Sequence, residues 1–334
     1  MTDRREFIKR SVMAGAGLTA GRLAFAKSYP QGNELKVGLI GLDTSHSPAF
    51  TKLINDPQNP AMQGVRVTLA YPYGSKRIES SASRIPQYTK EIQELGVVVV
   101  DSLQKVIDSS DVLMLMTNDG TMHLGQIMPV FKSGKPVYVD KPVAARLPEV
   151  MKIYELAKQH NVPVFSSSGL RYLDGAQKVR YHNAVGRVTG AEAYSPQKTE
   201  PSHTDLYWYG IHGVEILYTL MGTGCTEIKR ITGTEQDLVI GKWNDGRIGT
   251  YKGDLSGRQN YGGTAFGTDG VLPVGPFDGY RGLTEKIVSF FKERKSPVDE
   301  TETIELYTFM EAADVSKKRK GEWVRLEEVV SSNR

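Results

Sequence analysis

Long hydrophobic runs, clustered histidines and all but one cysteine are missing from this sequence. Cys225 is its only cysteine, so an internal disulfide is excluded, and we expect a packed small residue rather than a nucleophile there. No segment has the apolar length that a transmembrane helix needs, and we predict no membrane span. The 6 histidines are dispersed, with neither a His-x-x-x-His spacing nor a cysteine pair, so we predict no metal site.

A strong charge of one sign is also missing. The formal net charge is +4, and the first 26 residues account for most of it, with five Arg or Lys against two acidic residues. The remainder is nearly neutral, and we therefore predict no nucleic-acid partner. With 39% hydrophobic residues and this length, the chain can bury a substantial core in about two domains.

The N-terminal segment "DRREFIKRSVMAGAGLTAGRLAFA" pairs Arg4 with Arg5 ahead of a weakly apolar stretch. It resembles a twin-arginine export signal over residues 1–26, with cleavage expected after Ala26. This resemblance implies a periplasmic or otherwise exported protein that leaves the cytoplasm folded. The alternative is a basic amphipathic N-terminal helix.

From residue 34, apolar runs alternate with helical patterns, which is typical of a doubly wound parallel sheet. The expected strands are residues 35–42, 65–71, 97–100, 111–116, 136–139 and 162–166. One expected helix begins at residue 49, and three others cover residues 103–108, 121–132 and 148–160. We predict a Rossmann-type domain over residues 34–145, with its ligand beyond the carboxyl ends of the strands.

After about Arg187 the pattern changes to strands separated by glycine-containing turns, and the chain closes with two helical stretches. Residues 146–334 are therefore predicted to form an α+β domain on an open, mainly antiparallel sheet, with helices returning to the first domain. Because such a sheet can pair with a second subunit, we expect a homo-oligomer.

The stretch "VGLIGLDTSH" occupies the place of a glycine-rich dinucleotide fingerprint, but only its first glycine, Gly41, is present. Asp43 and His46 stand at the second and third glycine positions. We expect Asp43 to turn away from a phosphate, for instance to cap the next helix through the amides of Ser45 or His46. Thr44, Ser45 and His46 would then donate to the phosphates. The alternative is that Asp43 stands where the phosphates would lie.

An acidic residue is missing at the end of the second strand, where NAD-preferring sites usually have one. The segment "LAYPYGSKR" offers Ser75, Lys76 and Arg77 instead. These residues favour NADP over NAD, with NAD left open. The alternative is a solvated basic turn.

Polar residues follow the next two predicted strands. Thr117 and Asn118 end one strand, His123 lies in the first turn of the helix after it, and Asp140 and Lys141 end the following strand. These ends meet at the ligand-binding edge, so we expect the sheet to carry Lys141 into the site. The alternative for Lys141 is a solvated strand-end lysine.

This segment, with Asp-Lys-Pro at 140–142, resembles the Gfo/Idh/MocA oxidoreductases, which have Glu-Lys-Pro there. The resemblance covers nearly the whole chain after the export segment. The segment "YWYGIHGVEILYTLMG" is similar to the family's helix with an inward-facing histidine, which is His212 here. Many members have an aspartate four residues earlier, where this chain has Trp208; Asp205 is close enough in sequence to substitute. The alternative for His212 is a buried core histidine.

The resemblance implies hydride transfer between a secondary alcohol of a sugar or cyclitol and a nicotinamide cofactor, NADP or NAD. Lys141 would orient and polarise the substrate and His212 would accept the proton, with the two roles interchangeable. The predicted cofactor contacts are Gly41, Asp43, Thr44, Ser45, His46, Ser75, Lys76, Arg77, Thr117, Asn118, His123, Asp140 and Lys141. The candidate substrate contacts are Arg171, Tyr172, Asp174 and Asp205; for the first three a structural role at the domain junction is the alternative.

Two other functions stay open. Asp43, Trp208 and the absent acidic residue favour a cofactor-poor carbohydrate-binding or sensing protein on the same fold. A transient oxidation that assists glycoside cleavage or elimination also occurs among proteins of the resembled family, but no residue of this sequence selects it.

Overall fold

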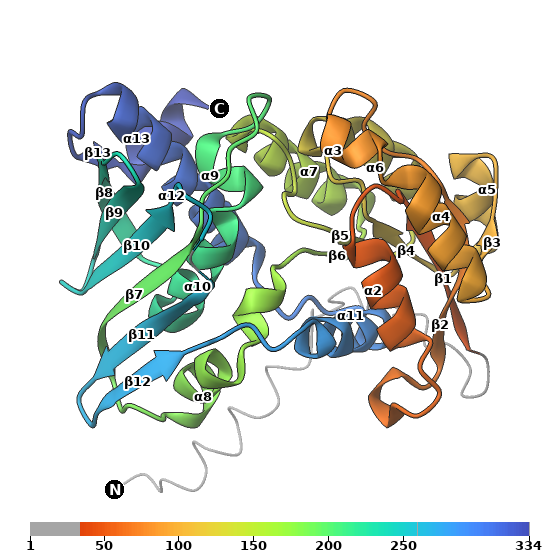
Figure 1. Cartoon of the computed structure of the whole chain (residues 1–334), viewed down its shortest axis with the longest axis horizontal. Coiled ribbons are helices and arrows are strands. Elements are labelled where there is room, and N and C mark those ends of the chain that lie inside the picture. Colours follow the sequence, from red (N-terminus) through yellow and green to blue (C-terminus); the bar gives the residue numbers. More distant parts are fainter. Residues whose placement is uncertain (1–33, 259, 334) are drawn as a thin grey trace, which may run out of the picture. The chain divides into compact units, whose positions relative to one another are not determined.

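The computed structural model describes residues 34–258 and 260–333, which form two β-sheets connected by helices (Figure 1). The predicted export segment, residues 1–26, lies outside the described residues. None of the helices in the described part is both long and apolar enough to cross a membrane.

The first sheet has six parallel strands in the order β3-β2-β1-β4-β5-β6. They are β1 (Leu35–Ile40), β2 (Val65–Tyr71), β3 (Val98–Val99), β4 (Val112–Leu115), β5 (Val137–Val139) and β6 (Val164–Phe165). This arrangement confirms the predicted doubly wound sheet, whose strand order reverses between β1 and β4. Because β6 belongs to it, the sheet continues past residue 145, where the sequence placed the end of the first domain.

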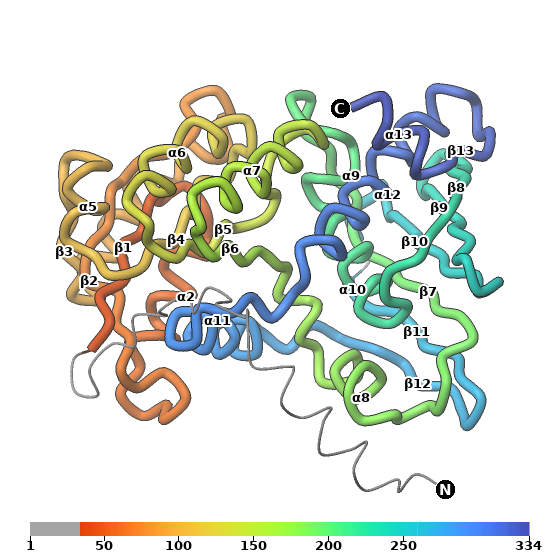
Figure 2. The backbone as a smooth tube through the Cα atoms, turned by 180° about the vertical axis from the view of Figure 1, so that it is seen from behind, coloured from red at the N-terminus to blue at the C-terminus, as the bar shows by residue number. Residues whose placement is uncertain are grey.

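Helices cover both faces of this sheet. Those between its strands are α2 (His46–Ile54), α3 (Glu79–Ala82), α4 (Ile85–Glu94), α5 (Leu103–Ser109), α6 (His123–Ser133) and α7 (Leu147–His160), with short 3-10 turns η1 (Pro60–Met62) and η2 (Gly120–Met122). Buried side chains of α5, α6 and α7 pack on one face. On the other face lie α2, α4 and α11 (Arg281–Glu293), a helix that returns from far along the chain (Figure 2).

The second sheet has seven strands in the order β12-β11-β7-β10-β9-β8-β13. They are β7 (Val188–Pro196), β8 (Cys225–Thr232), β9 (Gln236–Trp243), β10 (Ile248–Asp254), β11 (Gly262–Gly267), β12 (Val271–Val274) and β13 (Val324–Arg325). Its pairs are antiparallel except β7 with β10, which run parallel. The predicted mainly antiparallel sheet is therefore confirmed. Cys225 at the start of β8 is buried, as expected for a packing residue.

The remaining helices lie around the second sheet or connect it to the first. They are η3 (Gly169–Tyr172), α8 (Asp174–His182), α9 (Asp205–Trp208), α10 (Ile211–Met221), α12 (Glu300–Lys318) and α13 (Leu326–Ser332). Every residue of α10 is buried. This helix approaches the sheet so closely that a Cβ on Gly213 would lie 2.5 Å from the Tyr251 ring. Glycine is needed there because any side chain would push α10 off the sheet.

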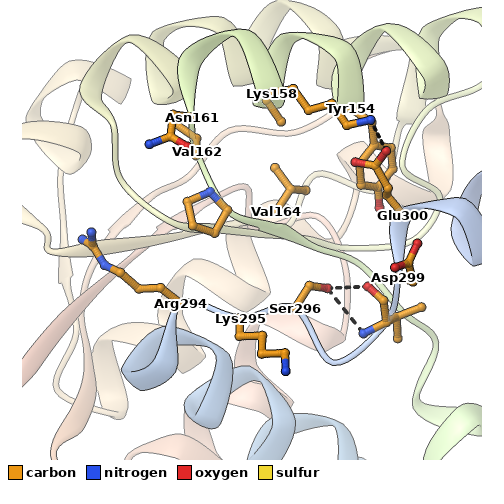
Figure 3. Close-up of a pocket in the computed structure, with 13 residues that line it drawn as sticks. Tyr154, Lys158, Asn161, Val162, Val164, Arg294, Lys295, Ser296, Asp299 and Glu300 are labelled. Carbon is orange, nitrogen blue, oxygen red and sulfur yellow. Dashed lines mark hydrogen bonds and ion pairs between the residues drawn. The ribbon is translucent and has the colours of Figure 1, made fainter. Parts of the chain in front are cut away.

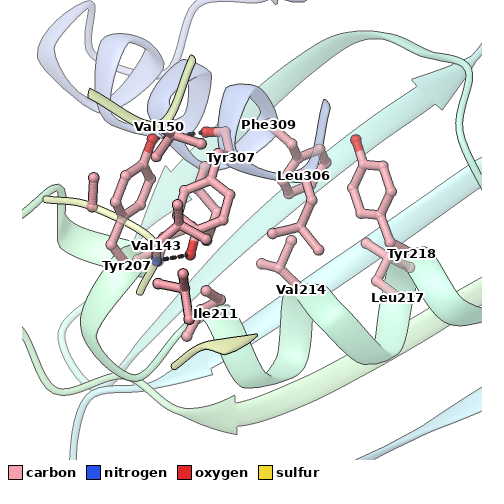
Figure 4. Packing of buried hydrophobic residues seen from close by; sticks show 14 of the residues in the cluster. Val143, Val150, Tyr207, Ile211, Val214, Leu217, Tyr218, Leu306, Tyr307 and Phe309 are labelled. Carbon is pink, nitrogen blue, oxygen red and sulfur yellow. Dashed lines mark hydrogen bonds between the residues drawn. The ribbon is translucent and has the colours of Figure 1, made fainter. Parts of the chain in front are cut away.

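A tyrosine pair connects α12 to the chain that follows β5 (Figure 4). The Tyr307 hydroxyl accepts a hydrogen bond from Val143 N–H at 2.6 Å, and Tyr207 donates to the Tyr307 carbonyl at 3.1 Å. The two rings also meet edge to face, with 4.7 Å between centroids. These buried contacts fix the backbone two residues after Lys141, so the position of Lys141 depends on the second half of the chain.

Candidate active site

The carboxyl ends of four neighbouring strands bring polar residues to one edge of the first sheet. Gly41 follows β1, Thr117 follows β4, Lys141 follows β5 and Ser168 follows β6. From the other half of the chain, the first turn of α10 brings His212 within hydrogen-bond distance of Ser168, with 2.7 Å between Oγ and Nδ1. The two residues predicted to carry the chemistry, Lys141 and His212, therefore meet at this edge.

Lys141 is partly buried and its ammonium group makes no hydrogen bond or ion pair with the described residues. Its charge acts on His212 and on Asp140. A half-buried cation without a partner is unusual, because burial of a charge is costly unless it is paired. Lys141 is therefore the group of this edge that is most available to a ligand.

His212 is buried, and the pKa of its imidazole lies well below the ordinary value because burial disfavours the cation and because Lys141 and His46 add positive charge nearby. The ring is uncharged at neutral pH. Its Nε2 has no hydrogen-bond partner in the described part of the chain. His212 can thus hold or offer a proton, but it does not supply a charge.

His46 contacts the carboxylate before Lys141. Its Nδ1 lies 2.8 Å from Asp140 Oδ2, while Tyr138 donates to Oδ1 at 3.2 Å. Burial by itself raises the pKa of Asp140, but His46, and less strongly Lys141, outweigh it and hold that pKa below its ordinary value. The His46 ring also stacks on Phe50. Both residues were predicted to contact cofactor; in the structure they are paired with each other.

Asp43 is fully buried and turned away from the start of α2. Its carboxylate accepts the backbone N–H groups of Ser75 and Asn118, both at 2.9 Å. The predicted cap on Ser45 or His46 is therefore wrong: Ser45 begins α2 without a side-chain cap, and His46 N–H bonds Thr44 Oγ1 at 3.3 Å instead. The two amides come from the loops after β2 and β4, so Asp43 connects three strand ends.

In the basic turn after β2, residues 75–77, two of the three side chains bond other groups of the protein. Ser75 Oγ donates to Asp119 at 2.7 Å, and Arg77 pairs with the same carboxylate at 2.9 Å and bonds Thr121 at 2.6 Å. Lys76 is exposed and makes no such contact among the described residues. Of the three residues predicted to favour NADP, only Lys76 has a side chain without a hydrogen bond or ion pair among the described residues.

Two of the predicted cofactor contacts after β4 have structural partners instead. The side-chain amide of Asn118 donates to Ser81 Oγ at 3.1 Å. His123 is fully buried between the carbonyls of Thr117, at 2.6 Å, and Val143, at 3.1 Å. Thr117 differs, because its hydroxyl is buried without a partner among the described residues and is free to bond a ligand.

Arg171, predicted to contact substrate, lies in a buried ion network. Its Nε bonds Glu215 at 2.6 Å and its guanidinium bonds Glu302 at 2.5 Å, while Arg180 pairs with the other Glu302 oxygen. Burial raises the pKa of Glu302, but Arg171 and Arg180 outweigh it and keep that pKa below the ordinary value. Arg171 thus joins η3 to α10 and α12, which is the structural alternative considered for it.

The other candidate substrate contacts also have partners within the protein. Asp174 is exposed and pairs with Lys178 in the next turn of α8. Asp205 pairs with Arg230 at 3.1 Å and with Lys317 at 2.7 Å, so it does not substitute for the aspartate that Trp208 replaces. Tyr172 packs against α11, where a Cβ on Gly282 would lie 2.8 Å from it.

An aromatic wall beside His212, formed by Tyr209, Tyr261, Phe277 and Tyr280, was not predicted from the sequence. The rings follow one another at centroid distances of 5.3 Å from His212 to Tyr261, 6.3 Å to Phe277 and 5.1 Å to Tyr280. Tyr280 then meets His46 at 4.9 Å. The signal that could have found part of the wall is the stretch "GPFDGY" between β12 and α11, where two aromatic residues stand among turn residues.

A cavity of about 480 Å³ lies at the opposite edge of the first sheet (Figure 3). It is lined by the end of α7, the start of β6 and the connection from α11 to α12, and Lys158 pairs with Glu300 across it. Because the cavity lies at the start of β6 (Val164–Phe165), it is separate from the edge with Lys141 and His212, which lies past the carboxyl ends of the strands. No group of three His, Cys, Asp or Glu within residues 34–258 and 260–333 is arranged to hold a metal ion.

The edge that holds Lys141 has the groups that a nicotinamide dinucleotide needs. The amides of Thr44 and Ser45 at the start of α2 have no hydrogen-bond partner among the described residues, which suits phosphate oxygens. Gly41 has a φ of +109°, and a Cβ there would lie 2.6 Å from Thr117 N, so the tight turn of the fingerprint is kept. The residues therefore fit the cofactor at the phosphates and at the Thr117 hydroxyl.

Residues 35–168 match the family model of the Gfo/Idh/MocA proteins, described as an oxidoreductase family with an NAD-binding Rossmann fold. The match spans the whole first sheet and ends at Ser168. For this part of the chain it supports the resemblance drawn from the Asp-Lys-Pro segment.

One curated relative is an uncharacterized oxidoreductase of Streptococcus pneumoniae serotype 4 (strain ATCC BAA-334 / TIGR4), 24% identical over 157 residues. The aligned part spans 42% of this chain and 42% of that protein, so it leaves more than half of the relative uncovered.

Two solved structures from Lactobacillus casei have the same fold. The scyllo-inositol dehydrogenase with bound NAD(H) and scyllo-inositol has a TM-score of 0.69 at 13% identity, over 88% of this chain and 100% of its own. The myo-inositol dehydrogenase in complex with NAD(H) and myo-inositol has a TM-score of 0.68 at 13% identity, over 87% and 96%. These two structures therefore share the fold of this chain.

The buried carboxylate of Asp43 predicts a pH dependence of stability. Burial raises its pKa from 3.8 to about 6, although the amides of Ser75 and Asn118 oppose the shift. The folded state therefore binds this proton more tightly than the unfolded state, so the stabilisation is complete below pH 3.8 and is lost as the pH rises through about 6. Asp43→Asn removes this titration. The free energy of unfolding of the wild type minus that of the variant should therefore fall by about 3 kcal/mol between about pH 4 and pH 7.

Denaturant unfolding of wild type and Asp43→Asn across that pH range measures the difference. Asp101→Asn, an exposed substitution, is the control and should keep the pH dependence of the wild type. A difference in the free energy of unfolding between wild type and Asp43→Asn that stays constant with pH would contradict the raised pKa of Asp43.

The buried network of Arg171 predicts a large structural cost. Arg171→Leu leaves the carboxylates of Glu215 and Glu302 without their shared partner and should reduce the free energy of unfolding by about 3–5 kcal/mol. The exposed Asp174→Asn in the same segment should change it by less than about 0.5 kcal/mol. If Arg171→Leu instead kept wild-type stability and weakened only substrate binding, the original substrate role would stand.

Proposed function

We propose that this chain transfers a hydride between a secondary alcohol of a sugar or cyclitol and a nicotinamide cofactor. The observation that carries the proposal is the unpaired ammonium of Lys141 beside uncharged His212 at the carboxyl edge of the first sheet. When bound, a nicotinamide ring accepts or returns the hydride. Lys141 and His212 are the two groups that act on the oxygen of the reacting carbon, where a proton must leave or arrive.

The aromatic wall supports a polyol substrate. Sugars and cyclitols present C–H groups on their ring faces and hydroxyls at their edges. Partly exposed aromatic rings suit the faces, and the few unpaired polar atoms nearby suit the hydroxyls. The dehydrogenases of the same fold with bound scyllo-inositol and myo-inositol agree with this class.

The choice between NAD and NADP belongs to the same proposal. Ser75 and Arg77 both bond Asp119, so Lys76 is the only one of the three predicted residues left to bind an extra ribose phosphate. The structure thus gives NADP less support than the sequence did, and titration with both cofactors decides between them.

We further propose that the protein is exported and forms a homo-oligomer. Export is supported by the arginine pair and the cleavage position at Ala26. A subunit contact through the second sheet is supported by the exposed apolar side chains of Ile248, Phe266 and Val271 on β10, β11 and β12.

A cofactor test separates this function from its cofactor-poor alternative. The purified protein should release NAD or NADP on denaturation or bind one of them on titration, and it should reduce NAD or NADP with a member of a sugar and cyclitol panel. A protein that binds neither cofactor would contradict the dehydrogenase and favour a carbohydrate-binding role.

Lys141→Met tests the residue placed at the reaction. Removal of a proton-transfer group should lower turnover by about 100-fold or more. Cofactor affinity should stay within about threefold, because binding rests on the start of α2 and on Thr117. Lys152→Met, an exposed lysine on α7, is the matched control and should keep full activity. Full activity in Lys141→Met would remove Lys141 from the mechanism.

A further inference from the structure

We infer that Ser168 donates its hydroxyl hydrogen to His212 Nδ1 and thereby makes His212 Nε2–H a hydrogen-bond donor toward the substrate oxygen. Lys141 is then the proton acceptor, and Ser168 is a positioning residue. This assignment rests on the proposed function for its chemical meaning, but the tautomer itself is a property of the protein alone.

The hydrogen bonds of Ser168 fix the direction of the contact. Its Oγ already accepts the N–H of Leu170 at 3.2 Å. A serine hydroxyl has one hydrogen and two lone pairs. Among the described residues, the acceptor in reach of that hydrogen is His212 Nδ1, at 2.7 Å. The hydrogen therefore lies on the serine, and Nδ1 is the acceptor.

The reverse arrangement would be costly. If Nδ1 carried the hydrogen, Ser168 Oγ would accept twice, and its own hydrogen would have no acceptor. Ser168 is only 1% exposed, so water does not replace the missing partner. An unsatisfied buried donor is costly enough to favour one tautomer over the other by about tenfold or more.

The surroundings of His212 keep its ring uncharged. The charged groups that act on it are Lys141 and His46, which oppose a second proton, and Asp140, which favours one but is already paired with His46. No carboxylate lies within hydrogen-bond distance of His212 in the part of the chain that the structure describes. A carboxylate at Nδ1 would leave Nε2 as a base, as in a Ser-His-Asp triad; a hydroxyl donor reverses this role.

The reaction then balances without a second proton on His212. In alcohol oxidation the C–H bond breaks and its electron pair leaves as hydride to the nicotinamide, which is reduced. The O–H bond breaks, and its proton passes to Lys141 once the Lys141 ammonium has released a proton to solvent; this transfer restores the ammonium. The Nε2–H of His212 stabilises the negative charge that develops on the oxygen. In carbonyl reduction the same proton returns from Lys141.

The test reads the tautomer directly. Two-bond 1H–15N correlation spectra of the full chain with 15N-labelled histidine report which ring nitrogen is protonated, and His212→Gln identifies the signals of His212. The expected result is one Nε2–H tautomer in the wild type from about pH 6 to about pH 8, unchanged in Ser168→Thr, which keeps the hydroxyl. In Ser168→Ala the preference should fall by about tenfold and signals of both tautomers should appear.

Ser166→Ala, in the same serine run, is the matched control and should leave the His212 signals unchanged. An Nδ1–H tautomer or an imidazolium in the wild type at neutral pH would overturn the inference, even if Ser168→Ala failed to fold. In turnover, Ser168→Ala should lower kcat by about tenfold and Ser168→Thr should restore it. A protein that binds no cofactor but shows the Nε2–H tautomer would contradict only the proposed function, whereas turnover with an Nδ1–H tautomer would contradict only this inference.

Discussion

The carboxylate of Asp43 is the interaction on which the edge of the first sheet depends. A fully buried carboxylate is tolerated only when hydrogen bonds replace its water, and here the amides of Ser75 and Asn118 do so. These amides belong to the loops after β2 and β4, so one side chain fixes three strand ends. The position that would be a glycine in the dinucleotide fingerprint has become a structural anchor, and the free amides of Thr44 and Ser45 remain beside it.

The pairing of His46 with Asp140 leaves the ammonium of Lys141 available at this edge. Asp140 precedes Lys141 directly, and an unpaired carboxylate there would be the natural partner of its ammonium. His46 contacts Asp140 from α2 instead, at 2.8 Å, and Lys141 is left unpaired at the end of β5. The same nearby positive charges, together with burial, keep His212 neutral. This edge therefore combines the unpaired ammonium of Lys141 with the uncharged imidazole of His212.

Local signals in the sequence were enough for most of the first sheet. The expected second strand has the bounds of β2, Ser102 caps α5, and Gly134 ends α6 in the left-handed conformation. Helices α3 and α4 were not expected; α3 has only 4 residues, and Ile92 is the only buried residue of α4. The parallel pairing of β7 with β10 was also missed, because alternation within a strand does not encode the direction of its neighbour.

The sequence by itself determined the fold class, and it predicted Lys141 and His212 as the candidate catalytic residues because the Asp-Lys-Pro turn and the helix with His212 are contiguous motifs. Only the tertiary structure decided which partner each polar group has. Arg171 bonds Glu215 and Glu302 rather than facing a substrate, and Ser168 reaches His212 across two elements. These partners lie tens of residues apart, and a buried charge or hydroxyl takes whichever partner the packing of distant elements brings within 3 Å or so.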